Sequence, residues 1–177
     1  SANEQLLKDC AARGIGAAFI TSAGYGEAGE SGRAAELQLV ETANATNVLL
    51  AGPNGQGVVS TPSSLCAQIV APYPPAGRIS IASQSGNFVS SFLNYSRQSG
   101  VGIARAISAG NATQVSVENF LDFFATDDET KVALTYIENV GDGDSLLTAM
   151  RHITAVKPLV VLKGGATAAG SKAAQSH

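Results

Sequence analysis

The fold is decided by one stretch of sequence, Ile79-Ser80-Ile81-Ala82-Ser83-Gln84-Ser85-Gly86-Asn87-Phe88. Its first half alternates β-formers with small residues, which predicts a strand. A polar turn follows, and the next apolar residues recur at helical spacing, at Phe88, Phe92, Leu93 and Tyr95. The stretch therefore predicts a strand, a tight turn and a helix.

The predicted helix begins at the turn, so its unpaired backbone N–H groups and the positive end of its dipole face the mouth of the turn. Gly86 keeps that mouth free of side-chain bulk, while Ser83 and Ser85 add hydroxyl groups. A phosphate or another oxyanion would fit this arrangement. The alternative is a turn without a ligand, in which Ser85 only caps the helix.

From residue 78 onward, strands and helices alternate strictly. The predicted strands are 78–83, 103–108, 131–137 and 158–163, and the predicted helices are 87–98, 116–125 and 144–155. Such alternation with short connections predicts an α/β fold with a doubly wound, parallel sheet of flavodoxin type and helices on both faces. The loops after the four strands should share one edge of the sheet, where open parallel sheets bind ligands.

Residues 1–59 show a second α/β pattern of helix, strand, helix and strand. The helices are predicted at 3–13 and 33–45 and the strands at 17–20 and 48–50, with a Gly-rich loop at 21–32. Two strands are too few to close a core. We therefore interpret 1–59 as the C-terminal half of a Rossmann-like domain, and we expect it to expose apolar surface where the missing half would pack.

Residues 60–77 contain Pro62, Pro72, Pro74 and Pro75. Because proline forbids a regular helix or a central strand, we interpret this segment as a connection between two domains, 1–59 and 78–177. Its apolar residues indicate that it packs on the surface.

Composition argues against several classes of partner. The net charge is −3 and the chain has no basic run, so nucleic acid is not an expected partner. No apolar run approaches the roughly 20 residues of a membrane span, and residues 1–4 do not look like a signal peptide. Cys10 and Cys66 lie far apart without histidine neighbours, which is typical of reduced cysteines. We expect a cytoplasmic protein without a metal site.

Few polar residues at the predicted edge could carry chemistry. Glu138 directly follows a strand whose residues after Lys131 carry no charge. It is a candidate site carboxylate, or else a solvated loop acid or the N-cap of the next helix. His177 ends the sequence, where a lone histidine usually has no role, and His152 is expected on the surface of a helix.

Seven motifs, taken in order, resemble the NDP-forming acyl-CoA synthetases, which are relatives of the succinyl-CoA synthetase α subunit. The resemblance runs from about residue 14 to the end, and Thr21 to Glu30 also looks like a coenzyme A-binding loop of this family. The motifs are Gly52-Pro53-Asn54, Ser83-Gln84-Ser85-Gly86, Ser108-Ala109-Gly110-Asn111, Asp127-Asp128-Glu129-Thr130-Lys131, Tyr136-Ile137-Glu138, residues 157–163 and Ala173-Ala174-Gln175-Ser176-His177.

The resemblance implies a flavodoxin-like CoA-ligase domain and a reaction. Members of the family make an acyl-CoA from a small carboxylic acid, coenzyme A and ATP or GTP, through an acyl phosphate and a phosphorylated histidine. That histidine matches His177, and the carboxylate that orients it matches Glu138. The helix start that holds the phosphate matches Ser83, Gln84, Ser85, Gly86 and Asn87. The coenzyme A loops match Ser22, Ala23, Gly24, Asn54 and Gly55.

The chain also departs from the family. Gly55 stands where members commonly have cysteine, and Ala166 stands where an arginine often follows. The sequence stops at His177, where the family continues, and it has no ATP-grasp domain. We therefore expect a piece of a longer or multi-chain enzyme, oligomeric and inactive alone. Its missing parts would be the N-terminal half-domain and an ATP-grasp domain or subunit, which would hold Mg²⁺.

Two other functions remain open from the sequence. Synthetase-like regions fused to acetyltransferases serve as non-catalytic sensors of CoA or acyl-CoA, although these tend to lack the histidine that matches His177. A plain flavodoxin-type binder of nucleotide or flavin is the second alternative. The loops lack the aromatic residues expected around a flavin.

Overall fold

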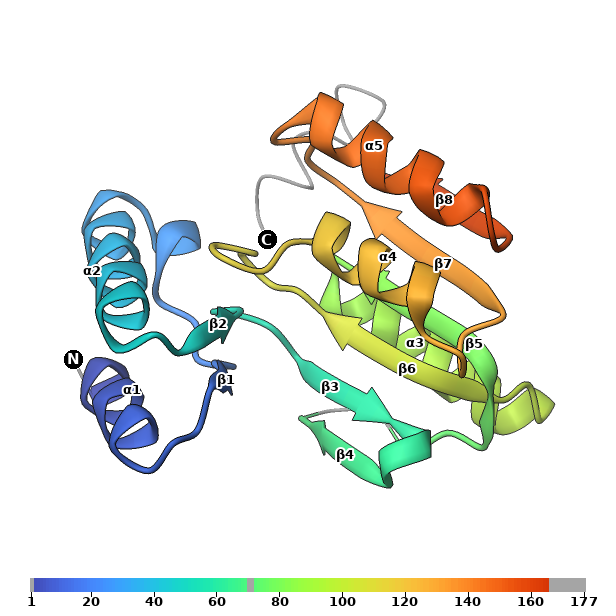
Figure 1. Ribbon diagram of the computed structural model, residues 1–177, viewed down its shortest axis with the longest axis horizontal. Coiled ribbons are helices and arrows are strands. Elements are labelled where there is room, and N and C mark those ends of the chain that lie inside the picture. The colour runs from blue at the N-terminus through green and yellow to red at the C-terminus, as the bar shows by residue number, and fades with distance from the viewer. Residues whose placement is uncertain (1, 70–71, 166–177) are drawn as a thin grey trace.

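The computed structural model describes residues 2–69 and 72–165 of the chain (Figure 1). The N-terminal part holds α1 (Ala2–Ala12), β1 (Ala17–Phe19), the 3₁₀ turn η1 (Gly26–Ala28), α2 (Glu30–Thr46) and β2 (Leu49–Ala51). β1 and β2 pair in parallel, with Ala18 opposite Leu50. Both helices pack on this pair, and their buried residues make a small core of their own around Leu7, Leu39 and Leu50.

A six-stranded mixed sheet forms the larger part. Its elements are β3 (Gly57–Ser60), the 3₁₀ turn η2 (Thr61–Ser63), β4 (Leu65–Gln68), β5 (Ala76–Ser83), α3 (Gly86–Ser99), β6 (Ile103–Ser108), α4 (Val117–Thr126), β7 (Val132–Ile137), α5 (Gly143–Thr154) and β8 (Leu159–Lys163). The strand order is β4-β3-β6-β5-β7-β8. The four predicted strands, β5 to β8, pair in parallel, which confirms the doubly wound part of the fold.

The expectation that residues 60–77 only connect two domains is wrong. The segment contains β4, which forms an antiparallel hairpin with β3 and extends the sheet beyond β6; β4 lies at the edge of the sheet, so the expected absence of a central strand holds. Pro62 lies in η2 between the two strands, and Pro72, Pro74 and Pro75 follow β4, so none of the four occupies a paired position. The prolines therefore delimit the hairpin rather than preclude it.

Helices cover both faces of the sheet, as predicted. α3 packs on one face, where Val89 and Leu93 meet Ile81 of β5. α4 and α5 pack on the other face, where Leu121 and Ile153 join a cluster that contains Ala82. Because Ile81 and Ala82 are neighbours in one strand, their side chains point to opposite faces. The alternating residues of β5 therefore contribute to two hydrophobic cores, one on each face of the sheet.

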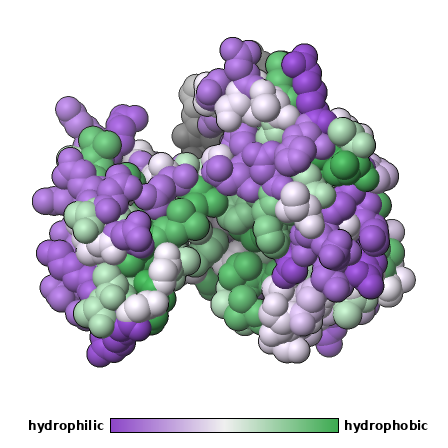
Figure 2. All heavy atoms as spheres, in the orientation of Figure 1, coloured by the Kyte–Doolittle hydropathy of each residue, from purple (hydrophilic) through white to green (hydrophobic). Residues whose placement is uncertain are grey.

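The small N-terminal sheet leaves apolar surface exposed, which is the surface that the sequence predicts beside its two strands. Among the described residues β1 pairs only with β2, and a hollow of about 290 Å³ runs between β1 and α1, lined by Leu6, Leu7 and Phe19 among others. Leu6 is 58% exposed and Leu49 of β2 is 54% exposed. Figure 2 shows that the molecule is indented between its two parts, with hydrophobic residues gathered along the indentation.

Two further observations concern membrane-spanning helices and the cysteines. Within residues 2–69 and 72–165, no helix is both long enough and apolar enough to cross a membrane. Cys10 and Cys66 are both free thiols.

Candidate functional site

A pocket of about 920 Å³ lies where the small sheet and the large sheet meet. The carboxyl ends of β2, β5, β6 and β7 all open toward it, because the loops that follow them line its wall. Its lining residues are Thr21, Gly26, Glu27, Gly29, Arg33, Glu36, Asn54, Gly55, Gln56, Ile69, Gln84, Ser85, Gly86, Asn87, Gly110, Asn111, Ala112, Glu138 and Asn139. The structure thus brings most of the candidate site residues to one cavity.

The start of α3 forms one wall of this pocket. Ser85 is the N-cap, and its Oγ accepts a hydrogen bond from the amide of Phe88 at 3.4 Å. In the described part of the chain, no acceptor contacts the amides of Gly86 and Asn87, which occupy the first turn of the helix. These two N–H groups are available to an anion in the pocket.

The first two residues of the predicted phosphate turn, Ser83 and Gln84, make hydrogen bonds within the protein. Ser83 is fully buried, and its Oγ donates to the carbonyl of Ser85 at 2.8 Å and accepts from the amide of Ser85 at 3.0 Å. The amide of Ser85 is therefore occupied and cannot hold an anion in this geometry. Ser83 shapes the turn from beneath instead of offering its hydroxyl group to the pocket.

Gln84 is committed to the loop that carries Glu138. Its backbone N–H donates to the carbonyl of Tyr136 at 3.1 Å. Its side-chain Oε1 accepts from the amides of Glu138 and Asn139 at 2.7 and 2.9 Å, and its Nε2 donates to the carbonyl of Asn139 at 2.9 Å. The side chain therefore grips the backbone of the β7–α5 loop, a contact that local sequence does not reveal.

Glu138 reaches the pocket from the end of β7, as the sequence predicts for its position. The carboxylate accepts a hydrogen bond from the hydroxyl of Tyr136. Burial raises the pKa of Tyr136, and the negative charge of Glu138 and this hydrogen bond raise it further. The Tyr136 ring stacks on Phe88 of α3 with centroids 5.0 Å apart. Lys163 Nζ donates to the carbonyl of Glu138 at 2.8 Å.

The predicted coenzyme A residues fall into two groups. Asn54 and Gly55 line the pocket, and the amide of Asn54 donates to the carbonyl of Ser22 at 3.0 Å. Ser22 and the next two residues, Ala23 and Gly24, are exposed in the Gly-rich loop. The two candidate loops are therefore neighbours. His177 lies outside the described residues.

Three polar residues of the site were missed by sequence reasoning. Asn111 Nδ2 donates to Glu27 Oε2 at 2.7 Å and to Glu36 Oε2 at 2.6 Å. Burial raises the pKa of Glu27, but the hydrogen bonds from Asn111 and from the amides of Gly24 and Tyr25 outweigh it and lower the pKa overall. Asn111 belongs to a quoted motif, but only the fold places it against two carboxylates from the N-terminal part.

Gln56 is a fourth missed residue, and it ties the loop after β2 to the start of α3. Its Oε1 accepts from the hydroxyl of Ser90 at 2.6 Å, and its Nε2 donates to Asn87 Oδ1 at 3.3 Å. The backbone of Gln56 donates to the hydroxyl of Ser108 at 3.1 Å. Gln56 thus fixes the loop after β2 against the start of α3 and the end of β6. Within the described ranges, no three His, Cys, Asp or Glu side chains are grouped so that they could hold a metal ion.

Comparison with known proteins assigns the larger sheet to a family. Residues 76–177 match the family described as the succinyl-CoA ligase like flavodoxin domain. Over 173 residues the chain is 37% identical to acetate–CoA ligase (ADP-forming) I of Archaeoglobus fulgidus. This match covers 98% of the chain and 25% of that protein. It is 35% identical to the α subunit of acetate–CoA ligase (ADP-forming) I of Pyrococcus furiosus, over 98% of this chain and 37% of that subunit.

A solved structure agrees with both parts of the fold. The dinucleotide-forming acetyl-coenzyme A synthetase 1 of Candidatus Korarchaeum cryptofilum, in complex with phosphate and ADP, superimposes with a TM-score of 0.90 and 28% identity. The match covers 98% of this chain and 37% of that one. The chain therefore spans only about a quarter to somewhat over a third of the length of these relatives.

Proposed function

The chain belongs to the ADP-forming acetyl-CoA synthetase family, and we propose that it carries the site at which such an enzyme joins coenzyme A to a small carboxylic acid, using ATP or GTP. In this proposal the acid is activated as an acyl phosphate, and the phosphoryl group travels between nucleotide and acid on His177. The chain is one part of the enzyme, because its relatives are several times longer or consist of subunits.

The observation that carries the proposal is the meeting of three groups in one pocket. The free amides of Gly86 and Asn87, the carboxylate of Glu138 and the loop of Asn54 and Gly55 all line the same cavity of about 920 Å³. An anion site, an acid–base group and a loop that resembles a coenzyme A loop are the parts that acyl-phosphate chemistry needs. The volume suits a substrate-sized ligand.

His177 is the proposed nucleophile. A neutral ring nitrogen attacks the phosphorus atom, forms an N–P bond and displaces either the nucleoside diphosphate or, in the reverse direction, the carboxylate of the acid. Glu138 accepts the N–H of the other ring nitrogen, which fixes the tautomer and stabilises the positive charge that develops on the ring. The amides of Gly86 and Asn87 hold the phosphoryl oxygens with dipoles that need no reorganisation.

The coenzyme A site is proposed where the two neighbouring loops meet. Ser22, Ala23 and Gly24 offer exposed backbone beside the pocket, and Asn54 and Gly55 form its wall. When bound there, coenzyme A supplies the thiol that attacks the acyl carbon of the acyl phosphate and releases phosphate. We propose residues 1–59 as the C-terminal half of the coenzyme A-binding domain.

The remaining parts of the enzyme complete the site in this proposal. The hollow between α1 and β1, together with exposed Leu6 and Leu49, is where the first half of the coenzyme A-binding domain would pack. An ATP-grasp domain or subunit would bring the nucleotide with Mg²⁺.

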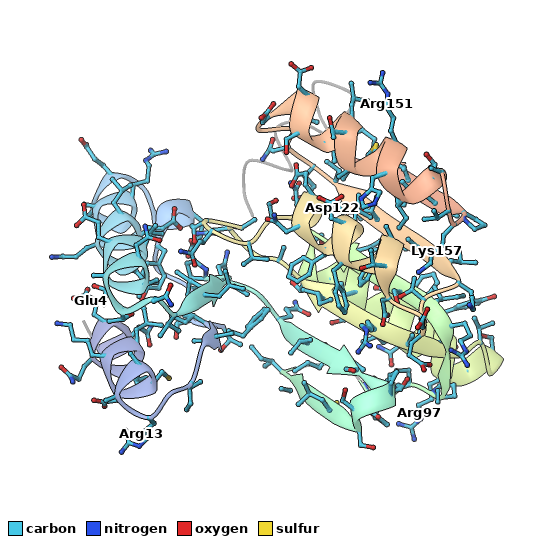
Figure 3. The ribbon with its side chains drawn as sticks, viewed as in Figure 1. Glu4, Arg13, Arg97, Asp122, Arg151 and Lys157 are labelled. Atoms are coloured by element: carbon cyan, nitrogen blue, oxygen red, sulfur yellow. The ribbon has the colours of Figure 1, made fainter. Side chains whose placement is uncertain are left out.

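The proposal is tested by locating the phosphoryl group. The sequence has only two histidines, so each serves as a control for the other. His152 lies on α5, and its Nδ1 contacts the Asp122 carboxylate of α4 at 2.9 Å; Figure 3 shows Asp122 reaching from α4 toward α5. This pair lies on the exposed side of the two helices.

The complete synthetase is incubated with ATP labelled on its γ-phosphorus, and acid-labile, base-stable label on the protein is counted. We expect full labelling in the wild type and in His152→Gln, and no label in His177→Ala. Label that persists in His177→Ala, or a wild type that makes acyl-CoA without ever carrying label, would refute the phosphohistidine.

A further inference from the structure

We propose that Gln84 is a positioning residue for Glu138: its side chain fixes the backbone of residues 138 and 139 and so aims the carboxylate into the pocket. This inference rests on the proposed function of Glu138, and it replaces the role of phosphate ligand that the sequence predicts for Gln84.

The first argument is the place of Gln84 in the sheet. β5 and β7 pair in parallel up to Ser83 and Tyr136, and the amide of Gln84 adds one more hydrogen bond to the carbonyl of Tyr136. Beyond this point the backbones separate, because one chain enters α3 and the other enters the β7–α5 loop. The Gln84 side chain spans this separation: it accepts hydrogen bonds from the amides of Glu138 and Asn139 and donates one to the carbonyl of Asn139.

The second argument is that Glu138 is held at each of its polar groups. Gln84 binds the amide, Lys163 Nζ binds the carbonyl and Tyr136 binds the carboxylate. Gln84 alone also holds the next residue, Asn139, at both its amide and its carbonyl. It therefore fixes the direction in which the chain leaves β7, and with it the direction of the Glu138 side chain.

The third argument is that the bonds stabilise little else. Residues 139–142, directly after Glu138, are exposed, with Val140 at 46%, and they do not belong to the hydrophobic clusters of the sheet. A purely structural clamp would be expected where it seals a core. These bonds instead lie on the rim of the pocket, beside the one carboxylate that the proposed reaction uses.

Such a clamp matters because catalytic geometry is sensitive. A group displaced by about 1 Å loses roughly 10²-fold in rate, so releasing the loop should slow the step that uses Glu138. Gln84→Leu removes all three side-chain bonds at nearly constant volume. Gln84→Glu keeps an acceptor for the two amides but loses the donor to Asn139 and adds a carboxylate near Glu138, so it should retain only part of the function.

The test is made on the complete synthetase with two measurements. The first is hydrogen–deuterium exchange in a peptide that spans 136–142, which reports on the loop whatever the chemistry. The second is the single-turnover rate of phosphoenzyme formation, measured for Gln84→Leu both alone and combined with Glu138→Gln. Gln98→Leu, an exposed glutamine of α3, is the matched control.

We expect Gln84→Leu to speed exchange at residues 138 and 139 and to slow phosphoenzyme formation about 10- to 100-fold, with Gln84→Glu between it and the wild type. In the Glu138→Gln background the same change should cost less than about twofold, since the group being positioned is already impaired. Gln98→Leu should change neither measurement.

Two results would overturn the inference. Unchanged exchange in Gln84→Leu would show that the clamp does not hold the loop, and an equal loss of rate in both backgrounds would show a general structural role. A wild type that never carries label would refute the proposed function instead, and in that case the exchange measurement still decides whether Gln84 holds the loop.

Discussion

The side-chain amide of Asn111, in the loop after β6, donates to the carboxylate of Glu36 in α2 at 2.6 Å, across 75 residues of sequence. The same amide group reaches Glu27 at 2.7 Å. Glu27 in turn accepts from the amide of Tyr25 at 3.1 Å and also from that of Gly24. One asparagine therefore fastens the Gly-rich loop of the N-terminal part to the rim of the large sheet, and with it one wall of the pocket.

Asn111→Asp should release this loop. The substitution preserves shape but places a third carboxylate beside Glu27 and Glu36, where the donor is lost and like charges repel. We expect faster hydrogen–deuterium exchange in residues 21–29 and weaker binding of coenzyme A to the complete synthetase, by about 10-fold or more. Asn94→Asp, at an exposed position of α3, adds the same charge and should change neither. Equal effects of the two variants would contradict the fastening role.

Gly110, on the same rim, should be hard to replace. It has φ of 62°, and an added Cβ would collide with the carbonyl oxygen of Pro53, where the two parts of the molecule meet. Gly100, with φ of 75°, has nothing within 4 Å of its Cβ position, so Gly100→Ala isolates the cost of the left-handed backbone, about 1 kcal/mol.

Gly110→Ala adds the collision to that cost, and we expect it to lower the free energy of unfolding by about 2–4 kcal/mol. Urea denaturation of the two variants gives the comparison. Losses of equal size would mean that the contact with Pro53 relaxes without cost.

The order of elements from residue 78 to β8 could be predicted because the strands are short and largely apolar, and β5, β6 and β7 are each followed by a helix with apolar residues at helical spacing. The Ser85 cap was also readable, since a serine before an apolar run at helical spacing is a local signal. The β3–β4 hairpin was not, because Pro62 falls in its turn and three further prolines follow it closely. β3 pairs with β6, more than 40 residues away, and this pairing cannot be predicted from the local sequence of either strand.

In the candidate site, too, the features that depend on local sequence could be predicted, and those that depend on distant contacts could not. Glu138 and Gly86 were placed correctly because the end of a parallel strand and the start of a helix are local features. The roles of Gln84, Gln56 and Asn111 depend on contacts across 31 to 84 residues. An amide side chain can serve equally well as a ligand contact or as a structural clamp, and only its partners distinguish the two.

Asp127 should give the protein an acid-sensitive component of stability. Arg105 donates to both carboxylate oxygens of Asp127 at 2.9 Å. These bonds lower its pKa from 3.8 to about 2, against the opposing effect of burial, and Thr130 contributes a further bond. Because the folded-state pKa is lowered, the stabilisation is complete above pH 4 and is lost as the pH falls toward 2. A shift of this size corresponds to about 2 kcal/mol.

Asp127→Asn should remove this pH dependence and lower the free energy of unfolding by about 2–3 kcal/mol at pH 7, because Arg105 loses a charged partner. Asp122→Asn, which removes a carboxylate from an exposed pair, should stay within about 0.5 kcal/mol of the wild type. Denaturation curves recorded from pH 7 to pH 2 provide the measurement. A wild-type profile that is flat between pH 4 and pH 2 would contradict the assignment.

The central claim is that Glu138 assists phosphoryl transfer at this pocket, and the rate of phosphoenzyme formation in Glu138→Gln tests it most directly. Glu129→Gln is the matched control, because Glu129 flanks the opposite end of β7 and pairs with Arg78 on the surface. In rapid-quench experiments with labelled ATP, we predict that Glu138→Gln forms the acid-labile species about 10²- to 10⁴-fold more slowly than the wild type, while Glu129→Gln matches the wild type. An unchanged rate in Glu138→Gln, with the label still on histidine, would contradict the claim.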